Sequence, residues 1–385
     1  MTTSDLSILT LDEVREAIER NIERDAASVA LDRSVPHASA VATQVKYLQR
    51  ARKKLPSLYA VRAIIPPRAF EQCSSEESAL RKPLSGDSVL DLTCGLGIDT
   101  MALAKNFRRV VSLERDPILA DVVRHNMRLM GITNVEVVTA SAEEYVAECE
   151  EHFDWVFADP DRRSADGHKM VVLEECSPNM RELMPRLCEI SERVAIKLSP
   201  LFDSDEAFRI FSPAEVEIVS LGGECKEVNI YTNAERDTLR IAIIGEGEWC
   251  YDTTAEHTPP STESFAEGEW RYLLIPDVAL MKGRVAIEAL KPYASIWSNN
   301  GYAFARELPP ANLPCRTFEI ATIRRYHPKE LKREYKGKRV DILKRDTRLT
   351  VDGVRQAIGA KAGSDIRVAV TTIDQDSWFI ELKRV

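Results

Sequence analysis

The sequence predicts an α/β protein in which a doubly wound, mostly parallel sheet is preceded by a helical segment and followed by a mixed α+β module. Three observations lead to this prediction. Apolar runs alternate with helical patterns over residues 85–244, helical periodicity dominates residues 1–84, and a Gly-, Ser-, Thr- and Pro-containing stretch over residues 245–270 precedes residues 271–385. Alternating strands and helices are typical of right-handed βαβ units with helices on both faces of the sheet. We therefore expect four segments: a helical segment, a sheet domain, a linker and a C-terminal module.

Short apolar runs mark the strands of the sheet domain, and polar residues mark the ends of its helices. Strands are expected at 88–92, 109–113, 135–139, 155–158 and 194–198. Helices are expected at 98–106, 117–130, 142–148 and 178–190. Asp116 is a suitable N-cap for the second of these helices, and Gly131 follows its last turn. Further strands at 216–220, 227–231 and 238–244 would follow, and the last two would form an antiparallel edge.

The N-terminal segment carries helix signals and no targeting signal. Thr10 and Glu13 fit a capping box, and apolar residues follow at helical spacing. The first residues lack the layout of a signal peptide, and no apolar run approaches the ~18 residues that span a bilayer. The eight cysteines and six histidines show no zinc-ligand spacing. We therefore expect a cytoplasmic protein without a membrane span or a metal site.

Charge is distributed unevenly along the chain. The net charge of −9 by itself argues against nucleic-acid binding. However, residues 324–348 hold eleven Lys and Arg against four acids, a balance of +7, and residues 46–54 hold five basic residues and no acid. Fields from distant charges are screened within ~10 Å, so concentrated basic patches can still attract phosphates. Tyr326, His327 and Tyr335 lie among the basic residues, which suits nucleic-acid contact. The alternative is a solvated helix face with Lys–Glu pairs.

A glycine-rich loop follows the first predicted strand. The segment 89–97 reads VLDLTCGLG, and its glycines allow a ligand to approach the backbone closely. Such a loop serves either a dinucleotide or S-adenosylmethionine. Asp91, four residues before Gly95, can meet the cationic amino-acid part of S-adenosylmethionine, whereas position 100 is Thr, so the GxGxxG pattern is incomplete. Thr93, Gly95 and Gly97 belong to the same expected cofactor contact.

Polar residues also follow the next two strands. Glu114 ends the second strand nineteen residues after Gly95, where a carboxylate can accept both ribose hydroxyls of an adenosine. Ser141 and Ala142 follow the third strand, where small residues can pack against adenine. These residues extend the predicted adenosine site along one edge of the sheet.

The fourth strand runs into a charged loop, ADPDRR. Asp159, Pro160, Asp161 and Arg162 therefore lie at the carboxyl edge, where doubly wound folds place their sites. A carboxylate at Asp159 can accept a hydrogen bond from an amine and free its lone pair for attack on a sulfonium methyl group. For Asp161 and Arg163 the alternative is a capping turn with a salt bridge.

Together, these motifs resemble those of class I S-adenosylmethionine-dependent methyltransferases, whose sheet is Rossmann-like. The resemblance covers residues 85–232 and implies that Asp91, Gly95 and Gly97 face the methionine part of the cofactor and Glu114 its ribose. More narrowly, the chain is similar to nucleic-acid amino-methyltransferases, whose fourth strand ends in Asn/Asp-Pro-Pro-aromatic. This implies that Asp159 and Pro160 receive the target amine. Asp161 replaces the second proline and Arg162 the aromatic residue; an arginine plane can also stack on a base.

The whole chain resembles a bacterial group of methyltransferases with a THUMP-like C-terminal domain. In that group a helical N-terminal segment carries a motif similar to FEQCSSE at residues 70–76, and the C-terminal third resembles an RNA-binding module. The resemblance implies RNA, either tRNA or rRNA, as the partner.

The predicted function is therefore S-adenosylmethionine-dependent methylation of an RNA base, at an amine nitrogen. Three alternatives stay open. A nicotinamide-dependent oxidoreductase is disfavoured by the incomplete glycine pattern. A non-catalytic RNA-binding protein is compatible with the altered residues 159–162. Methylation of a protein or a small molecule is the third.

Overall fold

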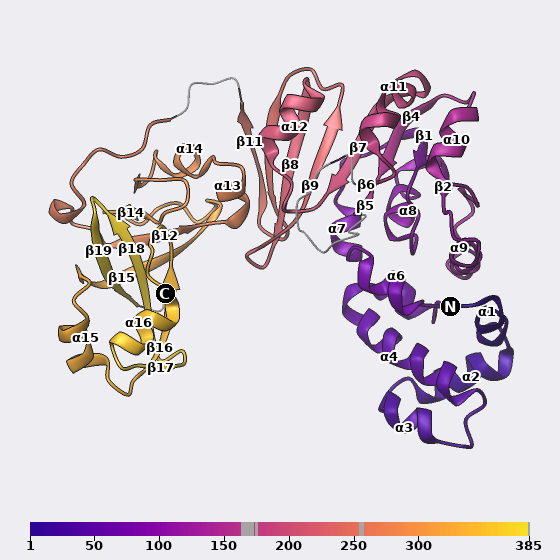
Figure 1. Ribbon diagram of the computed structural model, residues 1–385, viewed down its shortest axis with the longest axis horizontal. Coiled ribbons are helices and arrows are strands. Elements are labelled where there is room, and N and C mark those ends of the chain that lie inside the picture. The colour runs from indigo at the N-terminus through magenta and orange to yellow at the C-terminus, as the bar shows by residue number, and fades with distance from the viewer. Residues whose placement is uncertain (163–172, 174–175, 254–257, 384–385) are drawn as a thin grey trace. The chain divides into compact units, whose positions relative to one another are not determined.

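The computed structural model describes residues 1–162, 173, 176–253 and 258–383, and the chain divides into two compact units (Figure 1). The first unit comprises Met1–Phe202 and Ile230–Ala234, and the second comprises Asp203–Asn229 and Glu235–Val385. None of the helices in the described ranges combines the length and the apolar character that a membrane crossing needs.

A parallel sheet forms the centre of the first unit. Its strands are β1 (Gly86–Asp91), β2 (Phe107–Leu113), β3 (Val135–Val138), β4 (Phe153–Ala158) and β7 (Ser191–Leu198). They are arranged in the order β7-β4-β1-β2-β3, and each neighbouring pair is parallel. The central strands are buried because both faces are covered, which explains their continuous apolar runs. The predicted doubly wound sheet is confirmed.

Helices connect these strands, and their ends follow the expected capping rules. The helices are α8 (Ile98–Leu103), α9 (Pro117–Leu129), α10 (Ala142–Glu148) and α11 (Met180–Ile190). The Asp116 carboxylate accepts hydrogen bonds from the amides of Ile118 and Leu119 at the start of α9. Gly131 takes a positive φ of 68° just after α9. Two short strands, β5 (Asp161–Arg162) and β6 (Cys176–Ser177), pair antiparallel beside the sheet's carboxyl edge.

The N-terminal segment of the first unit is helical throughout. Its helices are α1 (Thr3–Leu9), α2 (Asp12–Asn21), α3 (Ala26–Leu31), α4 (Ala38–Lys54), α5 (Pro56–Ala60), α6 (Pro67–Gln72) and α7 (Glu76–Leu80). The capping box expected at Thr10 does not form. Thr10 ends α1, and its hydroxyl donates to the Ser7 carbonyl, so it is unavailable to the next helix. The box lies instead at Thr2 and Asp5.

Two buried amides fasten this helical segment internally and to the sheet domain. Asn126 of α9 is fully buried and pairs both ways with the backbone of Ile64, at 2.9 Å in each direction. Gln44 of α4 makes the same two-way contact with Ile65, at 2.9 and 3.1 Å. Apolar side chains of the segment join those of α8 and α9 in one hydrophobic cluster. Residues 1–80 therefore pack as part of the first unit.

In the second unit, four strands follow α12 (Ser204–Phe211) in the sequence. They are β8 (Ala214–Leu221), β9 (Glu224–Thr232), β10 (Thr238–Ile243) and β11 (Gly247–Asp252), in the order β11-β10-β8-β9. The last residues of β9 are counted with the first unit. Contrary to expectation, β10 runs parallel to β8, and the antiparallel edge strand is β11. This strand lies inside the predicted linker 245–270, where Gly247 and Glu248, which precede its aromatic residues, obscure the strand pattern.

The rest of the second unit is an eight-stranded sheet with short helices. The strands are β12 (Tyr272–Pro276), β13 (Ser295–Ile296), β14 (Ala303–Ala305), β15 (Cys315–Arg325), β16 (Arg339–Lys344), β17 (Lys361–Ala362), β18 (Ile366–Ile373) and β19 (Asp376–Leu382). The helices are α13 (Val278–Lys282), α14 (Ala286–Leu290), α15 (Pro328–Tyr335) and α16 (Val351–Ala357). Trp270 and Trp378 pack around Phe265 in the core of this unit, and the partly buried Trp297 packs against them.

We expect Asn126→Ala to lower the free energy of unfolding by about 1–3 kcal/mol, because the backbone N–H and C=O of Ile64 would lose their partner in a buried position. Urea unfolding measures this effect. Asn106→Ala is the matched control, since the Asn106 side chain is exposed. Equal stability of the two variants would show that the amide does not fasten the helical segment to α9.

Candidate active site

A cavity of about 470 Å³ lies at the carboxyl edge of the parallel sheet in the first unit. Residues that follow four different strands line it: 92–96 after β1, 113–116 at the end of β2, 140–143 after β3, and Asp159 after β4. The carboxyl edge of a doubly wound sheet is where such folds bind their ligands. The cavity has the size of a small-molecule site.

The glycine-rich loop takes its shape from backbone conformations that favour glycine. Gly95 and Gly97 have φ values of 54° and 82°. A Cβ on Gly97 would lie 3.0 Å from Val123, so this glycine is needed for packing against α9. A Cβ on Gly95 would meet nothing within 4 Å, and Gly95 lines the cavity. Open space beside the backbone of Gly95 fits a cofactor that contacts main-chain atoms.

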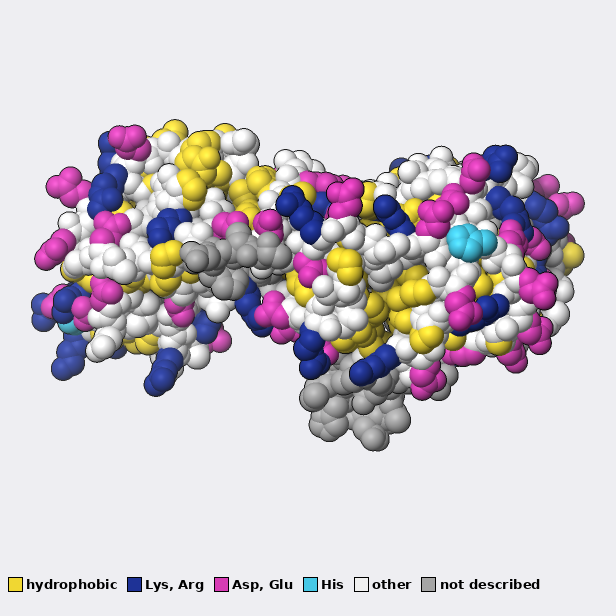
Figure 2. Space-filling model, turned by 90° about the horizontal axis from the view of Figure 1, so that it is seen from above, with side chains coloured by type: hydrophobic (Ala, Val, Ile, Leu, Met, Phe, Trp, Pro, Cys, Tyr) yellow, Lys and Arg dark blue, Asp and Glu magenta, His cyan; other side chains and the backbone are white. Residues whose placement is uncertain are grey.

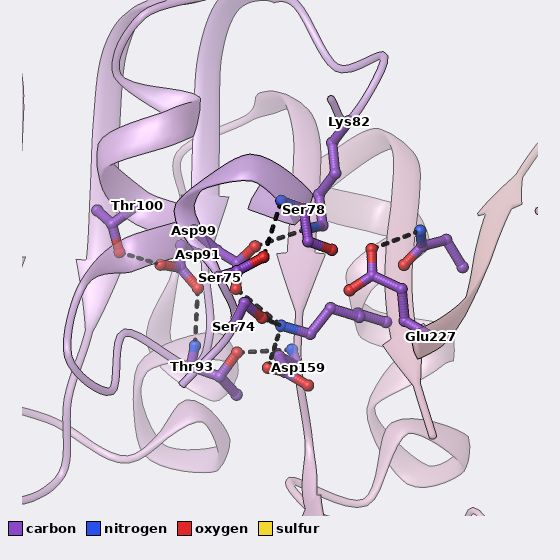
Figure 3. A network of polar contacts seen from close by, with 12 residues as sticks. Ser74, Ser75, Ser78, Lys82, Asp91, Thr93, Asp99, Thr100, Asp159 and Glu227 are labelled. Atoms are coloured by element: carbon purple, nitrogen blue, oxygen red, sulfur yellow. Dashed lines mark hydrogen bonds and ion pairs between the residues drawn. The ribbon is translucent and has the colours of Figure 1, made fainter. Parts of the chain in front are cut away.

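Asp91 lies beneath this loop and does not line the cavity. Its carboxylate accepts hydrogen bonds from the Thr93 amide at 3.0 Å, the Thr100 hydroxyl at 2.6 Å and the Ser112 hydroxyl at 2.7 Å (Figure 3 shows the first two). Burial raises the pKa of Asp91, and these three donors oppose that effect. Position 100, where the dinucleotide pattern would require glycine, therefore supports the aspartate. The predicted contact of Asp91 with a cofactor stays a prediction.

Glu114 lines the cavity at the end of β2 and is only 9% exposed. One carboxylate oxygen accepts from the Gly95 amide at 3.0 Å, and the other accepts from the Asp116 amide at 2.9 Å. Burial raises its pKa, while the two amides lower it. Each oxygen keeps a second lone pair, so the carboxylate can still accept ligand hydroxyls.

The residues after β3 lie on the same cavity. Ser141 and Ala142 line it at the start of α10. The Ser141 hydroxyl caps this helix by accepting from the Glu144 amide at 3.2 Å, so its backbone position is well defined. Small side chains here leave room for a flat ligand group.

The loop after β4 brings a second carboxylate to the cavity. The Asp159 amide donates to the Thr93 hydroxyl at 2.6 Å, which joins this loop to the glycine-rich loop (Figure 3). The Asp159 side chain is 37% exposed, and its carboxylate is paired with Lys197. Surrounding protein raises its pKa to about 6; Lys197 lowers it and Asp99 raises it.

The neighbours of Asp159 divide into those that reach the cavity and those that do not. Asp161 is exposed and lines it opposite Ser177, with which it pairs in the β5–β6 ladder. Pro160 is buried and is absent from the lining. The backbone of Arg162 pairs with that of Cys176. The Arg162 side chain and the whole of Arg163 lie outside the described residues, so their predicted roles stay predictions.

Three residues in or next to the cavity were not identified from the sequence: Lys82, Asp99 and Lys197. Lys197 of β7 donates to Asp99 of α8 at 2.8 Å and to Ser74 at 2.7 Å. Lys82 donates to the other oxygen of Asp99 at 2.6 Å. A lysine within the apolar run of a central strand is the signal that could have found Lys197, because lysine is almost never fully buried unless it is paired.

The FEQCSSE motif of the N-terminal segment also reaches the cavity. Gln72, Cys73 and Ser74 line it between α6 and α7. Ser75 caps α7 by accepting from the Ser78 amide. Burial raises the pKa of the Cys73 thiol, and burial raises that of the neighbouring Cys94 thiol to about 12. Within the described ranges, no group of three or more His, Cys, Asp or Glu side chains could hold a metal ion.

Two family models match the chain. A methyltransferase domain matches residues 89–182, and a THUMP domain-like module matches residues 315–384. An uncharacterised S-adenosylmethionine-dependent methyltransferase of Mycobacterium tuberculosis is 23% identical over 307 residues, which cover 76% of this chain and 80% of that protein. A 23S rRNA (uracil(1939)-C(5))-methyltransferase of Vibrio parahaemolyticus is 30% identical over 198 residues, which cover 46% of this chain and 43% of that protein.

One solved structure agrees with the fold over the full length. A protein of Porphyromonas gingivalis W83, described as a candidate methyltransferase, superposes with a TM-score of 0.85 at 24% identity, and the match covers 100% of both chains. This similarity establishes the fold. With the two domain matches and the cavity beside the glycine-rich loop, it follows that the chain carries an S-adenosylmethionine-dependent class I methyltransferase domain and, at its C-terminal end, a THUMP-like domain.

Proposed function

We propose that this protein transfers the methyl group of S-adenosylmethionine to a nucleobase of RNA. The observation that carries the proposal is the Asp159 carboxylate, which shares one cavity with the glycine-rich loop and Glu114. The RNA part draws on the THUMP-like domain and on the relatives whose names specify tRNA or rRNA as substrate. Those relatives match between about a third and a half of this chain.

The cavity residues suit the cofactor. Gly95 offers an open backbone, Glu114 can accept the ribose hydroxyls, and Ala142 and Ser141 leave space for adenine. Asp91 would act indirectly, by holding the loop from below. Bound S-adenosylmethionine supplies a methyl group on a positively charged sulfur. The acidic side chains Glu114 and Asp159 favour that charge within the cavity.

Asp159 is the residue best placed to handle the proton of the methyl acceptor. Its carboxylate can accept a hydrogen bond from an amine or ring N–H and take the proton that is released when the new bond forms. Thr93 fixes the Asp159 backbone, so the carboxylate starts from a defined position. The remaining contribution is the alignment of the two reactants in one cavity.

Two kinds of acceptor atom compete in this proposal. The named relatives act at C5 of uracil, a carbon that becomes nucleophilic when an enzyme thiolate adds to the ring. Cys73 and Cys94 line the cavity, but burial raises the pKa of both thiols, which disfavours the reactive thiolate. Asp159 instead supports a nitrogen acceptor, as the loop sequence predicts. We therefore favour nitrogen and make C5 an outcome of the test.

The RNA would be bound outside the cavity, by basic side chains of the THUMP-like domain. Figure 2 shows Lys and Arg interspersed with Asp and Glu over the face that it draws, so any basic surface is local. Part of the basic stretch is neutralised: Arg324 pairs with Glu334 at 2.8 Å, and Arg325 pairs with Asp376 at 2.8 Å. Several basic side chains of this domain are exposed and form no ion pair with described residues, and seven of them are Lys329, Lys332, Arg333, Lys336, Lys338, Arg339 and Lys361.

These seven residues, the C-terminal basic patch, lie around two adjoining turns. The Lys361 amide donates to the Lys338 carbonyl at 2.8 Å, and the Gly337 amide donates to the Gly359 carbonyl at 2.8 Å. A Cβ on Gly359 would touch the stems of Lys332 and Lys336 at 3.5–3.6 Å. The stems of Lys332 and Lys336 therefore lie close together, as do the backbones of Lys338 and Lys361, and none of the seven side chains forms an ion pair with a described residue, which leaves them able to contact phosphates.

We expect calorimetry to show binding of S-adenosylmethionine in the micromolar range, about −8 kcal/mol, and none of NAD. Glu114→Ala should weaken cofactor binding about tenfold or more, because a hydrogen bond to a charged group contributes ~1.5–3 kcal/mol. Glu136→Ala, an exposed acid on β3, is the control and should bind as the wild type does. Binding of NAD in place of S-adenosylmethionine would overturn the cofactor assignment.

We expect Asp159→Ala to bind the cofactor within a few-fold of the wild type and to lower methyl transfer by ~10² or more, because the proton acceptor is lost. Asp161→Ala should have a smaller effect. RNA from cells that lack the gene is treated with the protein, and mass spectrometry of its nucleosides identifies the product. An N-methylated base is expected. 5-Methyluridine would move the chemistry to C5, and no methylated nucleoside would refute the RNA proposal.

We expect RNA affinity to fall with salt, each neutralised phosphate contributing about −0.7 to −0.9 to the log–log slope. Replacing Lys332, Arg333, Lys336 and Lys338 by Ser should flatten the slope by up to ~3 and leave cofactor binding unchanged. Filter binding to bulk tRNA at several salt concentrations measures it.

The matched control for this experiment replaces three basic residues of the same domain that are already paired, Arg325, Arg367 and Lys383. It should change the slope less. Identical salt dependence in the wild type and the quadruple variant would mean that the C-terminal basic patch is only a solvated surface.

A further inference from the structure

Four charged side chains form a connected group beneath the cavity: Lys82, Asp99, Asp159 and Lys197 (Figure 3 labels the first three). The lysine side chains are 3% and 7% exposed. Burying an ammonium group is unfavourable unless it is paired and hydrogen-bonded. The fold therefore holds two cations here with two carboxylates, and both carboxylate residues line the cavity.

The contacts of Lys197 fix the direction of its ammonium group. It reaches Ser74 Oγ at 2.7 Å, Asp99 Oδ2 at 2.8 Å and Asp159 Oδ2. An ammonium has three N–H bonds, and these three acceptors can occupy all of them. The acceptors come from three separate parts of the first unit: the α6–α7 segment, α8 and the loop after β4. Asp99 is in turn held by Lys82.

We propose that Lys197 is a positioning residue. Ser74 and Asp99 anchor its ammonium group, which holds the Asp159 carboxylate ionised and leaves Asp159 Oδ1 directed to the reacting groups. The inference rests on the proposed role of Asp159. Oδ1 has no hydrogen bond to a described residue, so it is the oxygen that can receive an acceptor proton. Ser74 makes the FEQCSSE motif part of this arrangement.

The charges that act on Asp159 have opposite effects, which makes the role testable. Burial raises its pKa and so does Asp99, whereas Lys197 and Lys82 lower it. With a pKa of about 6, Asp159 is ionised at neutral pH and becomes protonated as the pH falls below that value. Removing a lysine should therefore raise the pKa, and removing the Asp99 charge should lower it. A group without electrostatic contact with Asp159 would shift its pKa in neither direction.

The experiment compares S-adenosylmethionine with S-adenosylhomocysteine, which lacks the positive charge on sulfur. Calorimetry from pH 5 to pH 8 gives the ratio of the two affinities. An ionised Asp159 attracts the positively charged sulfur, which only S-adenosylmethionine carries. The preference for S-adenosylmethionine should therefore fall as the pH is lowered, with a midpoint near pH 6, the pKa of Asp159. Groups common to both ligands cancel in the ratio. Asp159→Asn should remove this transition, and any pH dependence that remains belongs to Glu114, the other cavity carboxylate with a raised pKa.

Lys197→Met should move the midpoint upward by about one to three pH units, the usual effect of a neighbouring opposite charge. Lys197→Arg keeps the charge and should move it less. Asp99→Asn should move it downward. If a variant binds S-adenosylhomocysteine at pH 8 with an affinity within a few-fold of the wild type, that variant is folded. If Lys197→Met does not fold, Lys82→Met serves instead and should raise the midpoint by a smaller amount.

An unchanged midpoint in a folded Lys197→Met, or in Lys82→Met where that variant replaces it, would overturn the proposal. The result is distinct from a failure of the proposed function. A transition that keeps its size and its midpoint near pH 6 in Asp159→Asn would show that Asp159 does not act on the cofactor, whatever Lys197 does. A protein that passes both tests but leaves RNA unmethylated would keep the Lys197 inference and lose only the RNA substrate.

Discussion

The buried Asp91 carboxylate determines the shape of the candidate site. A charge without solvent contact needs several hydrogen-bond donors, and Asp91 obtains them from the Thr93 amide and the hydroxyls of Thr100 and Ser112. The Thr93 hydroxyl then accepts from the Asp159 amide. A single buried group thus sets the loop after β1, and through Thr93 the loop after β4. The distance between the cofactor loop and the residue proposed to receive a proton depends on this short chain of contacts.

Features that depend on local sequence were predicted well. The alternation of strands and helices predicted the parallel sheet. Asp116 and Gly131 mark the two ends of α9, as expected. Glu114 and Asp159 line the cavity because both follow strands of one parallel sheet, whose carboxyl ends share an edge. The positions of Glu114 and Asp159 could therefore be predicted from the ends of their strands alone, without knowing which other side chains they contact.

Features that depend on contacts distant in the sequence were missed. Lys197 meets Asp99 and Ser74 across 98 and 123 positions, and no spacing pattern reports such a pairing. The composition of residues 245–270 predicts a linker, whereas β11 lies within that stretch. The charge count over residues 324–348 was correct but overstated the free charge. Arg324 and Arg325 are paired with Glu334 and Asp376, and Asp376 lies outside the counted stretch.

The position of Ser74 bears on how far the catalytic domain is modular. The methyltransferase match begins at residue 89, and a chain cut at residue 85 would retain every strand of the parallel sheet. It would nevertheless lose Ser74 and Lys82, and it would expose the floor on which Lys197 and Asp99 meet. The methyltransferase match therefore covers the sheet core, whereas the contacts of Lys197 and Asp99 also need Ser74 and Lys82, which lie before that match. Grafting this core onto another RNA-recognition module would require its helical segment to be carried along.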